Sequence, residues 1–594
     1  MSAERLALLP KVGPTRAGRL LSAFLAAAPA YELIELLVPA GVDARVAGRV
    51  VDALGPGAAR AVRDDPWLLL SVHGIAPRDA DHVAVRAVPG IARDDPRRAR
   101  ALVGYVLAHE ARAGHTVTPR DQVIDALDEF SPGEAPVAIA AALDAATVIE
   151  MADKTLALAR YAEAEDAIAE GVARLVATGE PIETRPIADV AVLDADQRVA
   201  VAHALRSGVS VLTGGPGTGK SRTVATVVAL VESAGRSVAL AAPTGRAAKR
   251  LEELCNSPAS TLHRLLGAQP RQRGNEVSFT GGFARGVEWP LEEDVVVVDE
   301  ASMLDVELAE ALFTACADGT HVVLVGDAAQ LPSIGPGRVL GDLIDTGLVP
   351  TTELRTLYRQ AEGGAIARLA TSVRGGELPD VDDPGREVVV VPARGSADAA
   401  HRVVQLVIDS IPRALGIASD QVQVVTPIHR GNAGTQALNA ALKARLNPSF
   451  GRGRFDPGDR VVATANHLEA EPFGYANGEV GVVSEVGPAG AVIVEFASGP
   501  AEIKGKALAE LMHGWAITVH RAQGSEFTAV VVVLPAESGR MLSRPLVYTA
   551  FTRAQRHLSV VAATGPTLAR AVRLIGAIPR RTQLQHLLGE YLTR

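Results

Sequence analysis

The feature that most constrains this chain is a glycine-rich segment set between an apolar stretch and a helix-like stretch. Residues 214–221 read GGPGTGKS and match the pattern G-x-x-x-x-G-K-[ST] at every fixed position. The largely apolar residues 209–212 predict a strand before it, and residues 223–230 predict a helix after it. Backbone N–H groups in such a loop turn inward around a phosphate, and the helix N-terminus adds partial positive charge. The sequence therefore predicts a nucleotide site on an α/β sheet.

Two side chains of this loop have direct roles in nucleotide chemistry. Lys220 can reach the β- and γ-phosphates, and the Ser221 hydroxyl can ligate Mg²⁺. The residues expected to bind the nucleotide are Gly215, Pro216, Gly217, Thr218, Gly219, Lys220, Ser221 and Arg222. Gln197 lies in a predicted helix just ahead of the loop, where its amide can bond an adenine edge. Taken alone, such a glutamine is more often a solvated helix residue, so the loop decides its interpretation.

Length and composition limit the class of protein. A chain of 594 residues is too long for one hydrophobic core, so several domains are expected. With a formal net charge of −9, any nucleic-acid site must be a local groove. Two cysteines are too few for a disulfide framework and indicate buried thiols in a reducing compartment. No signal peptide and no long uninterrupted apolar run are visible, which predicts a cytoplasmic protein with no membrane partner.

The first third of the chain is predicted to be helical and to form two units. In residues 1–96, the turns at 9–14 and 72–77 each precede a helix and resemble helix-hairpin-helix modules, whose turn amides hold a DNA phosphate. A plain helical bundle is the alternative. Residues 97–183 indicate a winged-helix-like unit, with helices near 120–127 and 136–143, strands within 148–158 and a long final helix.

From residue 184 the pattern becomes strand–helix alternation, which is the sign of a parallel sheet. The strand predicted at 238–242 ends in a basic, polar turn, at the strand end where α/β sheets place ligand contacts. The residues expected to hold a nucleic-acid backbone here are Pro243, Thr244, Arg246, Lys249, His263 and Arg264. A solvated first helical turn is the alternative for these side chains.

Two further strand ends bear catalytic residue types. The apolar strand at 295–298 is followed by Asp299, which can bind Mg²⁺ through water, and by Glu300, which can polarise the attacking water. The strand at 321–325 is followed by Gln330, whose amide can sense the γ-phosphate because it both donates and accepts. An N-terminal helix cap and a solvated loop glutamine are the ordinary alternatives, and the phosphate loop outweighs both.

An insertion at 268–290 interrupts the alternation. Residues 276–280 and 283–286 are predicted to pair as a β-hairpin around a two-glycine turn.

With these residues in hand, the chain resembles a superfamily 1B helicase of the RecD-like group, of the stand-alone type with an N-terminal helix-hairpin-helix extension. The resemblance covers nearly the whole chain. Its second-half motifs are at 357–360 (LYRQ), 426–431 (TPIHRG), 438–439 (LN), 446–448 (LNP), 518–526 (TVHRAQGSE) and 548–554 (YTAFTRA).

This resemblance implies an α/β multidomain fold with two RecA-like cores and ATP, with Mg²⁺, in the cleft between them. The first core would be 184–346, and the second would combine 347–454 with 513–594 around an SH3-like insertion at 455–512. Arg359 and Arg553 would act as arginine fingers on the γ-phosphate. The second-core residues implied to contact DNA are Thr426, His429, Arg430, Asn439, Thr518, His520 and Gln523.

The implied function is ATP-dependent 5′→3′ unwinding of DNA in repair or recombination, with the 268–290 hairpin as the pin that splits the duplex. Single-stranded DNA and duplex junctions would be the partners, with a single-strand-binding protein as a further one. Two alternatives stay open: a motor subunit of a multi-subunit exonuclease, and a DNA-binding translocase that does not unwind. An RNA substrate is a weaker possibility, because no feature indicates recognition of a 2′-hydroxyl.

Overall fold

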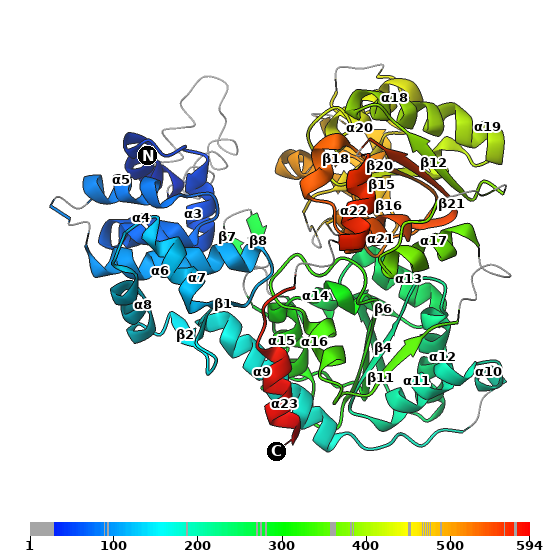
Figure 1. Ribbon diagram of the computed structural model, residues 1–594, viewed down its shortest axis with the longest axis horizontal. Helices are drawn as coiled ribbons and strands as arrows, with labels where there is room; N and C mark the ends of the chain where they lie inside the picture. The colour runs from blue at the N-terminus through cyan, green and yellow to red at the C-terminus, as the bar shows by residue number, and fades with distance from the viewer. Residues whose placement is uncertain are drawn as a thin grey trace, which may run out of the picture.

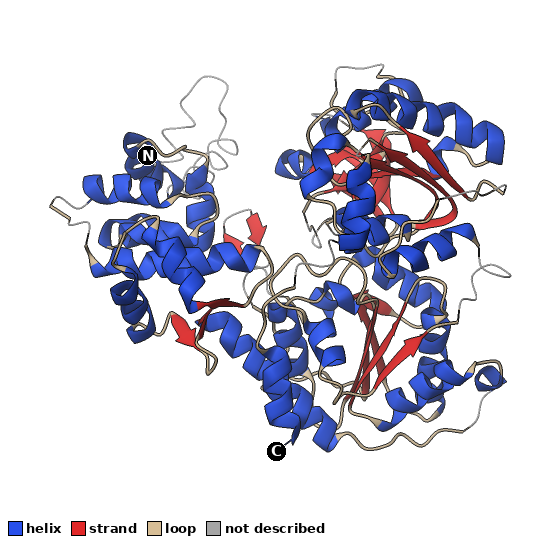
Figure 2. Cartoon of the chain, in the orientation of Figure 1, coloured by secondary structure: helices blue, strands red, loops and turns tan. Residues whose placement is uncertain are grey.

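The computed structural model forms three bodies (Figures 1 and 2). An N-terminal helical body lies beside a first α/β core, and a second α/β core lies above the first in the view of Figure 1. The structure describes residues 29–593 except 88–89, 92–93, 186–187, 269–270, 274–275, 279–281, 357–363, 381–382, 384, 450–452, 466, 468–469, 471, 473, 476, 488–489, 564 and 575–578.

The N-terminal body has its own hydrophobic core, which includes the buried Trp67. Its helices are α3 (Val46–Leu54), α4 (Ala58–Asp64), α5 (Pro77–Ala87) and α6 (Pro96–Arg112). The predicted turn at 72–77 leads into α5, and Gly74 there has a left-handed φ of 87°. The other predicted turn, at 9–14, lies outside the described residues.

The unit predicted to be winged-helix-like has the expected order of elements. They are β1 (Val117–Pro119), α7 (Arg120–Asp128), α8 (Ala135–Asp144), β2 (Val148–Glu150), β3 (Thr155–Leu158) and α9 (Ala159–Thr178). β3 pairs antiparallel with both β1 and β2. The apolar face of α9 packs on the first core, so this unit joins the N-terminal body to the motor.

The first core is a six-stranded parallel sheet of order β11-β4-β10-β9-β5-β6. In that order the strands are β11 (Thr351–Leu354), β4 (Val209–Gly214), β10 (His321–Gly326), β9 (Val295–Val298), β5 (Val238–Ala242) and β6 (Ala259–Thr261). The strands predicted at 238–242, 295–298 and 321–325 are confirmed. Their valine-rich runs suit a sheet that is buried on both faces.

Helices cover both faces of this sheet. One face carries α11 (Ala195–Arg206), α12 (Lys220–Ser233) and α13 (Gly245–Cys255). The other carries α15 (Val306–Ala315) and α16 (Val339–Asp345), together with α9, in a separate apolar cluster. Two short helices, α10 (Ala188–Ala191) and α14 (Leu262–Leu265), lie at the edges of the core.

The insertion in the first core does contain a two-stranded antiparallel pair, but not the predicted one. β8 (Glu276–Ser278) pairs with β7 (Arg271–Arg273), which precedes it, and not with residues 283–286. Phe283 forms an isolated bridge with Ala268 instead. The prediction paired the strands around the glycine pair, and the observed pair of strands precedes those glycines.

The second core is a five-stranded parallel sheet of order β12-β21-β20-β13-β19. Its strands are β12 (Val388–Pro392), β21 (Ala554–Ala562), β20 (Phe527–Leu534), β13 (Val422–Thr426) and β19 (Ala516–Thr518). One face is covered by α17 (Ala365–Arg374), α21 (Arg544–Phe551) and α22 (Pro566–Leu574). The other is covered by α18 (Ser396–Gln405), α19 (Ile411–Leu415) and α20 (Thr435–Leu446).

A five-stranded antiparallel sheet is inserted between α20 and β19. Its strands are β14 (Arg460–Ala463), β15 (Val480–Val486), β16 (Val492–Phe496), β17 (Gly499–Ile503) and β18 (Leu511–His513). The predicted short strands near 459–465, 478–484 and 491–496 are therefore present. The SH3-like assignment of this sheet stays a prediction.

The end of the described chain departs from the predicted domain division. The sequence assigned all of 513–594 to the second core, yet α22 is the last helix that packs there. The final helix, α23 (Leu584–Thr593), lies against α9 beside the first core, as Figure 1 shows in red. Leu584 and Leu588 are buried in the apolar cluster of the first core, which explains the return.

Within the part of the chain that the structure describes, no helix has both the length and the apolar character needed to cross a membrane.

Candidate active site

A cavity of about 510 Å³ lies where the two cores meet. Its walls are made of the phosphate loop, the ends of β9 and β10, and loops of the second core. The lining residues are Gln197, Gly215, Pro216, Gly217, Gly219, Lys220, Ser221, Arg222, Ala225, Arg250, Leu254, Asp299, Glu300, Asp327, Gln330, Glu526 and Arg553. The structure thus brings together most of the nucleotide and catalytic residues predicted from separate motifs.

The phosphate loop runs from the end of β4 into the first turn of α12. Gly217 and Gly219 have left-handed φ values of 79° and 89°, which residues with a Cβ rarely adopt, so the loop requires glycine at both positions. The buried Thr218 hydroxyl donates to the Gly215 carbonyl at 2.8 Å and holds the loop closed. Lys220 Nζ donates to the Gly215 carbonyl at 3.0 Å, so the amine lies over the loop.

The carboxylates of Asp299 and Glu300 stand at the carboxyl end of β9 and face the cavity. Burial raises the pKa of both groups, and the neighbouring Asp299 charge raises that of Glu300 further. Glu300 also has a left-handed φ of 52°, an unfavourable backbone conformation for a residue with a side chain. Such strain is typical of functional sites, where the surrounding structure holds a side chain in place.

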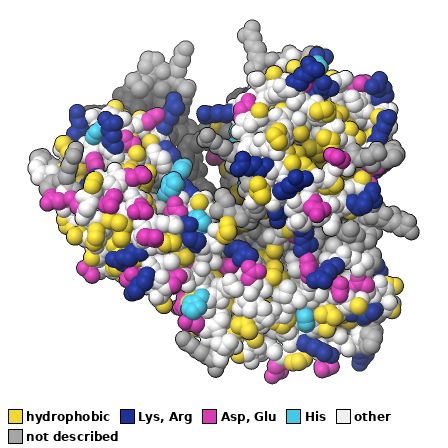
Figure 3. Space-filling model, viewed as in Figure 1, with side chains coloured by type: hydrophobic (Ala, Val, Ile, Leu, Met, Phe, Trp, Pro, Cys, Tyr) yellow, Lys and Arg dark blue, Asp and Glu magenta, His cyan; other side chains and the backbone are white. Residues whose placement is uncertain are grey.

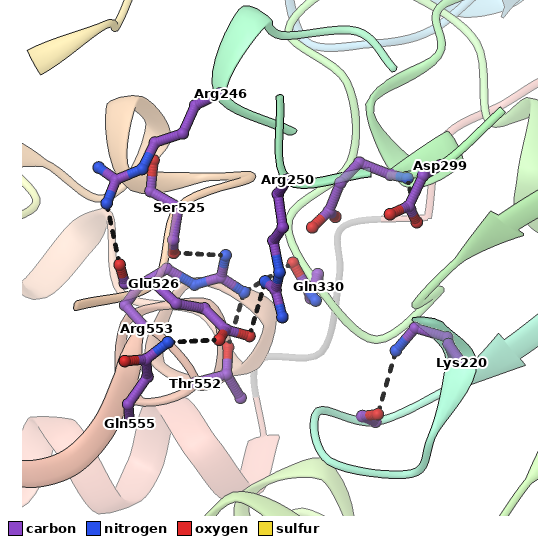
Figure 4. Close-up of polar contacts among 12 residues, drawn as sticks. Lys220, Arg246, Arg250, Asp299, Gln330, Ser525, Glu526, Thr552, Arg553 and Gln555 are labelled. Atoms are coloured by element: carbon purple, nitrogen blue, oxygen red, sulfur yellow. Dashed lines mark hydrogen bonds and ion pairs between the residues drawn. The ribbon is translucent and has the colours of Figure 1, made fainter. Parts of the chain in front are cut away.

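Gln330 and Arg553 meet across the cleft from opposite cores. Arg553 Nη2 donates to Gln330 Oε1 at 3.1 Å, and Nη1 donates to the Ser525 carbonyl at 3.2 Å (Figure 4). Its Nε donates to the Thr549 carbonyl at 2.9 Å. Arg553 is only 3% exposed. These bonds hold its guanidinium at the cavity wall, opposite the phosphate loop.

Gln197 is buried and lines the cavity from α11. Its side-chain oxygen accepts from the Asp194 N–H at 3.1 Å, and its own N–H donates to Asp194 Oδ1 at 2.7 Å, which together form a capping box. The side-chain nitrogen of Gln197, Nε2, has no hydrogen-bond partner among the described residues. A buried unpaired donor is costly, so this group is poised to bond a ligand atom.

Three further bonds connect the two cores around the loop that bears Gln330. Tyr548 donates to Asp327 Oδ2 at 2.7 Å, and Leu331 N–H donates to Thr549 Oγ1 at 2.8 Å. Gln523 Nε2 donates to the Leu331 carbonyl at 2.8 Å. Gln523, which was predicted to contact DNA, thus bonds the loop of the first core that bears Gln330.

An ion pair also connects the two cores, and the sequence did not predict it. Arg250 Nη1 lies 3.0 Å from Glu526 Oε1, and Arg246 Nη2 donates to the Glu526 carbonyl at 3.0 Å (Figure 4). Arg246 also lies over the Phe527 ring, 4.5 Å from its centroid. The basic turn after β5 was predicted to hold DNA, but these two arginines contact the second core. The two arginines and Glu526 each lie in a motif that the sequence analysis identified, but only the fold shows that these motifs are in contact.

The other predicted DNA residues of the first core lie along one edge. Thr244 caps α13 by accepting from the Ala247 N–H, and Pro243 precedes it. Lys249 is paired with Glu252 at 2.7 Å. Arg264 is exposed on α14, and the His263 ring lies 6.0 Å from the Phe283 ring.

In the second core, two predicted DNA residues have structural roles. Asn439 is 5% exposed, and both atoms of its amide bond the backbone of Ala516 at 2.8 Å. It therefore fastens α20 to the edge strand β19. The buried Thr426 hydroxyl donates to the Ala433 carbonyl and shapes the loop after β13.

The remaining predicted residues of the second core differ in exposure. His429 and Arg430 are exposed in the loop after β13, where His429 Nδ1 lies 3.1 Å from Thr435 Oγ1. Thr518 ends β19 and is buried, whereas His520 follows that strand and has its pKa lowered by burial. Arg359 lies outside the described residues.

Over the face drawn in Figure 3, basic and acidic side chains are interspersed. This distribution agrees with the expectation that a nucleic-acid site in this acidic chain is local.

Three family models match segments of the chain. The ATP-dependent RecD2 DNA helicase HHH domain matches residues 27–117, the AAA domain matches 192–387, and the UvrD-like helicase C-terminal domain matches 513–561. The first covers the described part of the N-terminal helical body, and the other two cover the elements that form the cavity.

Curated relatives match over most of the chain. It is 35% identical over 543 residues to the ATP-dependent RecD2 DNA helicase of Deinococcus radiodurans, across 87% of this chain and 72% of the relative. It is 34% identical to the RecBCD enzyme subunit RecD of Mycobacterium tuberculosis, across 71% of this chain and 80% of the relative. Among solved structures, Bacteroides Pif1 bound to ssDNA aligns over 62% of this chain and 92% of that chain, with 18% identity and a TM-score of 0.39. The extent and identity of the first match establish that this chain belongs to the RecD2 family of ATP-dependent DNA helicases.

Proposed function

We propose that this helicase moves 5′→3′ on single-stranded DNA and unwinds duplex at junctions, in DNA repair or recombination. The observation that carries the proposal is the divided cavity, because the phosphate loop comes from one core and Arg553 from the other. A site built in this way couples the chemistry of ATP to the relative position of the two cores.

The lining of the cavity fits ATP with Mg²⁺. Ser221 and Asp299 supply hydroxyl and carboxylate oxygens, the ligand types that Mg²⁺ prefers, and both line the cavity beside Lys220. Mg²⁺ held by these two residues would supply positive charge that neutralises charge on the phosphates. The unpaired amide nitrogen of Gln197 would bond an acceptor on the adenine edge.

The hydrolytic step follows from the side chains that face the cavity. Lys220 binds the β- and γ-phosphates, and Glu300 orients and polarises the attacking water. Arg553 stabilises negative charge that develops on the γ-phosphoryl oxygens, as an arginine finger does. We assign the same role to Arg359. Gln330 contacts Arg553 and lies on the loop that bonds the second core, so it would report the state of the γ-phosphate to that core.

Translocation then results from alternate tightening of the two cores on DNA. The exposed residues His429, Arg430 and Arg264 are the proposed contacts to phosphates and sugars, with Thr518 and His520 linking DNA to the cleft. Backbone contacts of this kind tolerate any sequence. The insertion at 268–290 is the proposed pin at the junction. A single-strand-binding protein is a proposed partner, and the cytoplasm is the proposed compartment.

The decisive experiment is strand displacement by the purified chain, with ATP and Mg²⁺, on matched duplexes that carry either a 5′ or a 3′ single-stranded tail. Unwinding from the 5′ tail alone is expected. Unwinding from the 3′ tail alone would contradict the proposed direction. Shortening the 268–290 insertion should stop unwinding and preserve DNA-stimulated ATPase, whereas equal loss of both would assign it a structural role.

A second candidate is a motor subunit of a larger enzyme, which the similarity to RecBCD subunit RecD favours. ATPase stimulated by single strands, without displacement from either tail, would support this alternative.

A further inference from the structure

The segment after α22 returns to the first core and contacts the loop that bears the catalytic glutamine. This loop, residues 326–338, is called the sensor loop below. Arg580 Nη1 donates to the carbonyls of Gly335 and Gly337 at 2.8 and 2.7 Å and to Ser333 Oγ at 2.9 Å. Arg580 Nη2 donates to the Ser333 carbonyl. One guanidinium thus binds three alternate positions, 333, 335 and 337, in the second half of the sensor loop.

The first half of the same loop lies in the ATP cleft. Gln330 accepts from Arg553, Leu331 bonds Thr549 and Gln523, and Asp327 accepts from Tyr548. Only Pro332 separates these residues from Ser333, the first position that Arg580 holds. A shift in the second half of so short a connection would therefore be transmitted to Gln330.

The chain segment that bears Arg580 is itself held by contacts of the next two residues. The neighbouring Arg581 pairs with Glu110 of α6 at 2.6 Å, and its backbone N–H donates to His115 at 3.0 Å. Thr582 donates to Asp342 of α16 at 2.8 Å. These contacts hold the segment on both sides of the interface between the N-terminal unit and the first core.

The site around Arg580 is closely fitted. Gly114 has a left-handed φ of 97°, and a Cβ at this position would lie 2.2 Å from Arg580 Nε. The Gly114 carbonyl in turn accepts from the Gly337 N–H at 3.0 Å. A planar guanidinium can reach several carbonyls with fixed geometry, which the single ammonium group of lysine cannot do.

We propose that Arg580 is a positioning residue for ATP hydrolysis, which holds the sensor loop so that Gln330 meets Arg553 in the cleft. The role is indirect, because the hydrogen bonds of the Arg580 guanidinium go to the sensor loop and Arg580 does not line the cavity. It depends on the proposed role of Gln330, and the experiment below tests the two separately.

The test is steady-state ATP hydrolysis by the full chain, saturated with single-stranded DNA, over a range of ATP concentrations. R580A should lower kcat about tenfold, since small displacements of catalytic groups have effects of this size or larger, and should change KM by less than about twofold. R573A is the matched control: it removes an exposed arginine at the end of α22 whose side chain is not among the contacts to the sensor loop, so kcat should be unchanged.

A double mutant separates positioning from general destabilisation. If Arg580 acts through Gln330, R580A should have little further effect on kcat in the Q330A background, because changes in one pathway are not additive. A wild-type kcat for folded R580A would overturn the proposal, as would an equal tenfold loss in the Q330A background. A wild-type kcat for Q330A alone would instead refute the sensor role of Gln330.

All variants are compared at a temperature well below their thermal unfolding, which is measured for each. If R580A does not fold, R580K is the second variant, because it keeps the aliphatic stem and the charge but loses the planar fork. It should lower kcat in the same direction, and a wild-type kcat for R580K would also overturn the proposal.

Discussion

The two cores of this helicase share an architecture but differ in what stands at the ends of their strands. Both are parallel sheets covered by helices on both faces. In the first core, β4 and β9 end in the phosphate loop and the acidic pair. In the second core, β13 and β19 end in Thr426 and Thr518, and neither strand leads into a phosphate loop. The same fold thus supplies the phosphate-binding groups on one side of the cleft, and on the other side groups that change position when the nucleotide changes.

This difference teaches how the site is assembled. Features that bind phosphate are complete within the first core, where glycine torsions and the strained Glu300 are set locally. The contributions of the second core depend on bonds that cross the cleft, such as Arg553 to Gln330. We therefore expect substitutions in the first core to affect nucleotide binding and hydrolysis together, and those in the second to affect hydrolysis alone.

The largest effect is expected for K220A in the first core. Without the amine, the β- and γ-phosphates lose their principal charged partner, and ATP hydrolysis should fall to background with the fold intact. K504A, at an exposed lysine of the inserted sheet, is the control and should keep full activity. Hydrolysis near the unmutated rate, with contaminating ATPases excluded, would refute the site assignment.

The next effect is expected for R553K in the second core, which keeps charge but loses the fork that bonds Gln330, Ser525 and Thr549. The rate of hydrolysis should fall about 1000-fold, the scale of an arginine finger, while nucleotide affinity changes little. The measurements are kcat and the dissociation constant of a fluorescent ATP analogue. R556K, at an exposed neighbour, is the matched control. Equal loss of affinity and rate would remove the contrast between the cores.

A smaller effect is expected at the ion pair that joins the cores. R250A and E526Q should each reduce DNA-stimulated ATPase a few-fold, and a double-mutant cycle should give a coupling of about 1 kcal/mol, since the pair is partly shielded from solvent. The same cycle on Arg236 and Asp294, a pair inside the first core, is the control and should give no coupling in this assay. Purely additive effects at Arg250 and Glu526 would mean that the pair does not connect the cores in function.

The smallest effect concerns stability and pH at the N-terminal side of the first core. Burial raises the pKa of Glu165 on α9 from 4.5 to about 7. Between these values the folded protein binds more protons than the unfolded chain, so the contribution of this group to stability is fully present below about pH 4.5. It is lost as the pH rises through 7.

E165Q removes this titration. The difference in melting temperature between E165Q and the unmodified protein should rise by a few degrees from pH 5 to pH 8. E170Q, an exposed position on the same helix, should give a difference that does not vary with pH. A flat profile for E165Q would show that Glu165 does not titrate in this range.

Much of the motor could be predicted because its chemistry is local in sequence. The phosphate loop, Asp299 with Glu300, and Gln330 each follow a valine-rich strand, and parallel strands bring their carboxyl ends to one edge. The cavity then contains them as expected. Gln197 lines the same cavity, and its role in the capping box was not foreseen.

Contacts between distant segments could not be predicted, because no local pattern encodes them. Asn439 looked like a DNA contact but completes two backbone bonds of an edge strand. Arg246 looked like a phosphate ligand but binds the second core. The hairpin was assigned one strand too late, since paired glycines are a strong turn signal, and here the antiparallel pair forms before them.

The return of α23 to the first core has a consequence for how the protein is made. Thr582 and its partner Asp342 are separated by 240 residues, and the whole second core lies between them in the chain. During synthesis, the apolar surface of α9 and α16 therefore emerges long before Leu584 and Leu588 arrive to cover it. Until the second core has been translated, the apolar surface that Leu584 and Leu588 later cover stays exposed to solvent. We expect the nascent chain to be prone to aggregation and to bind chaperones during this interval.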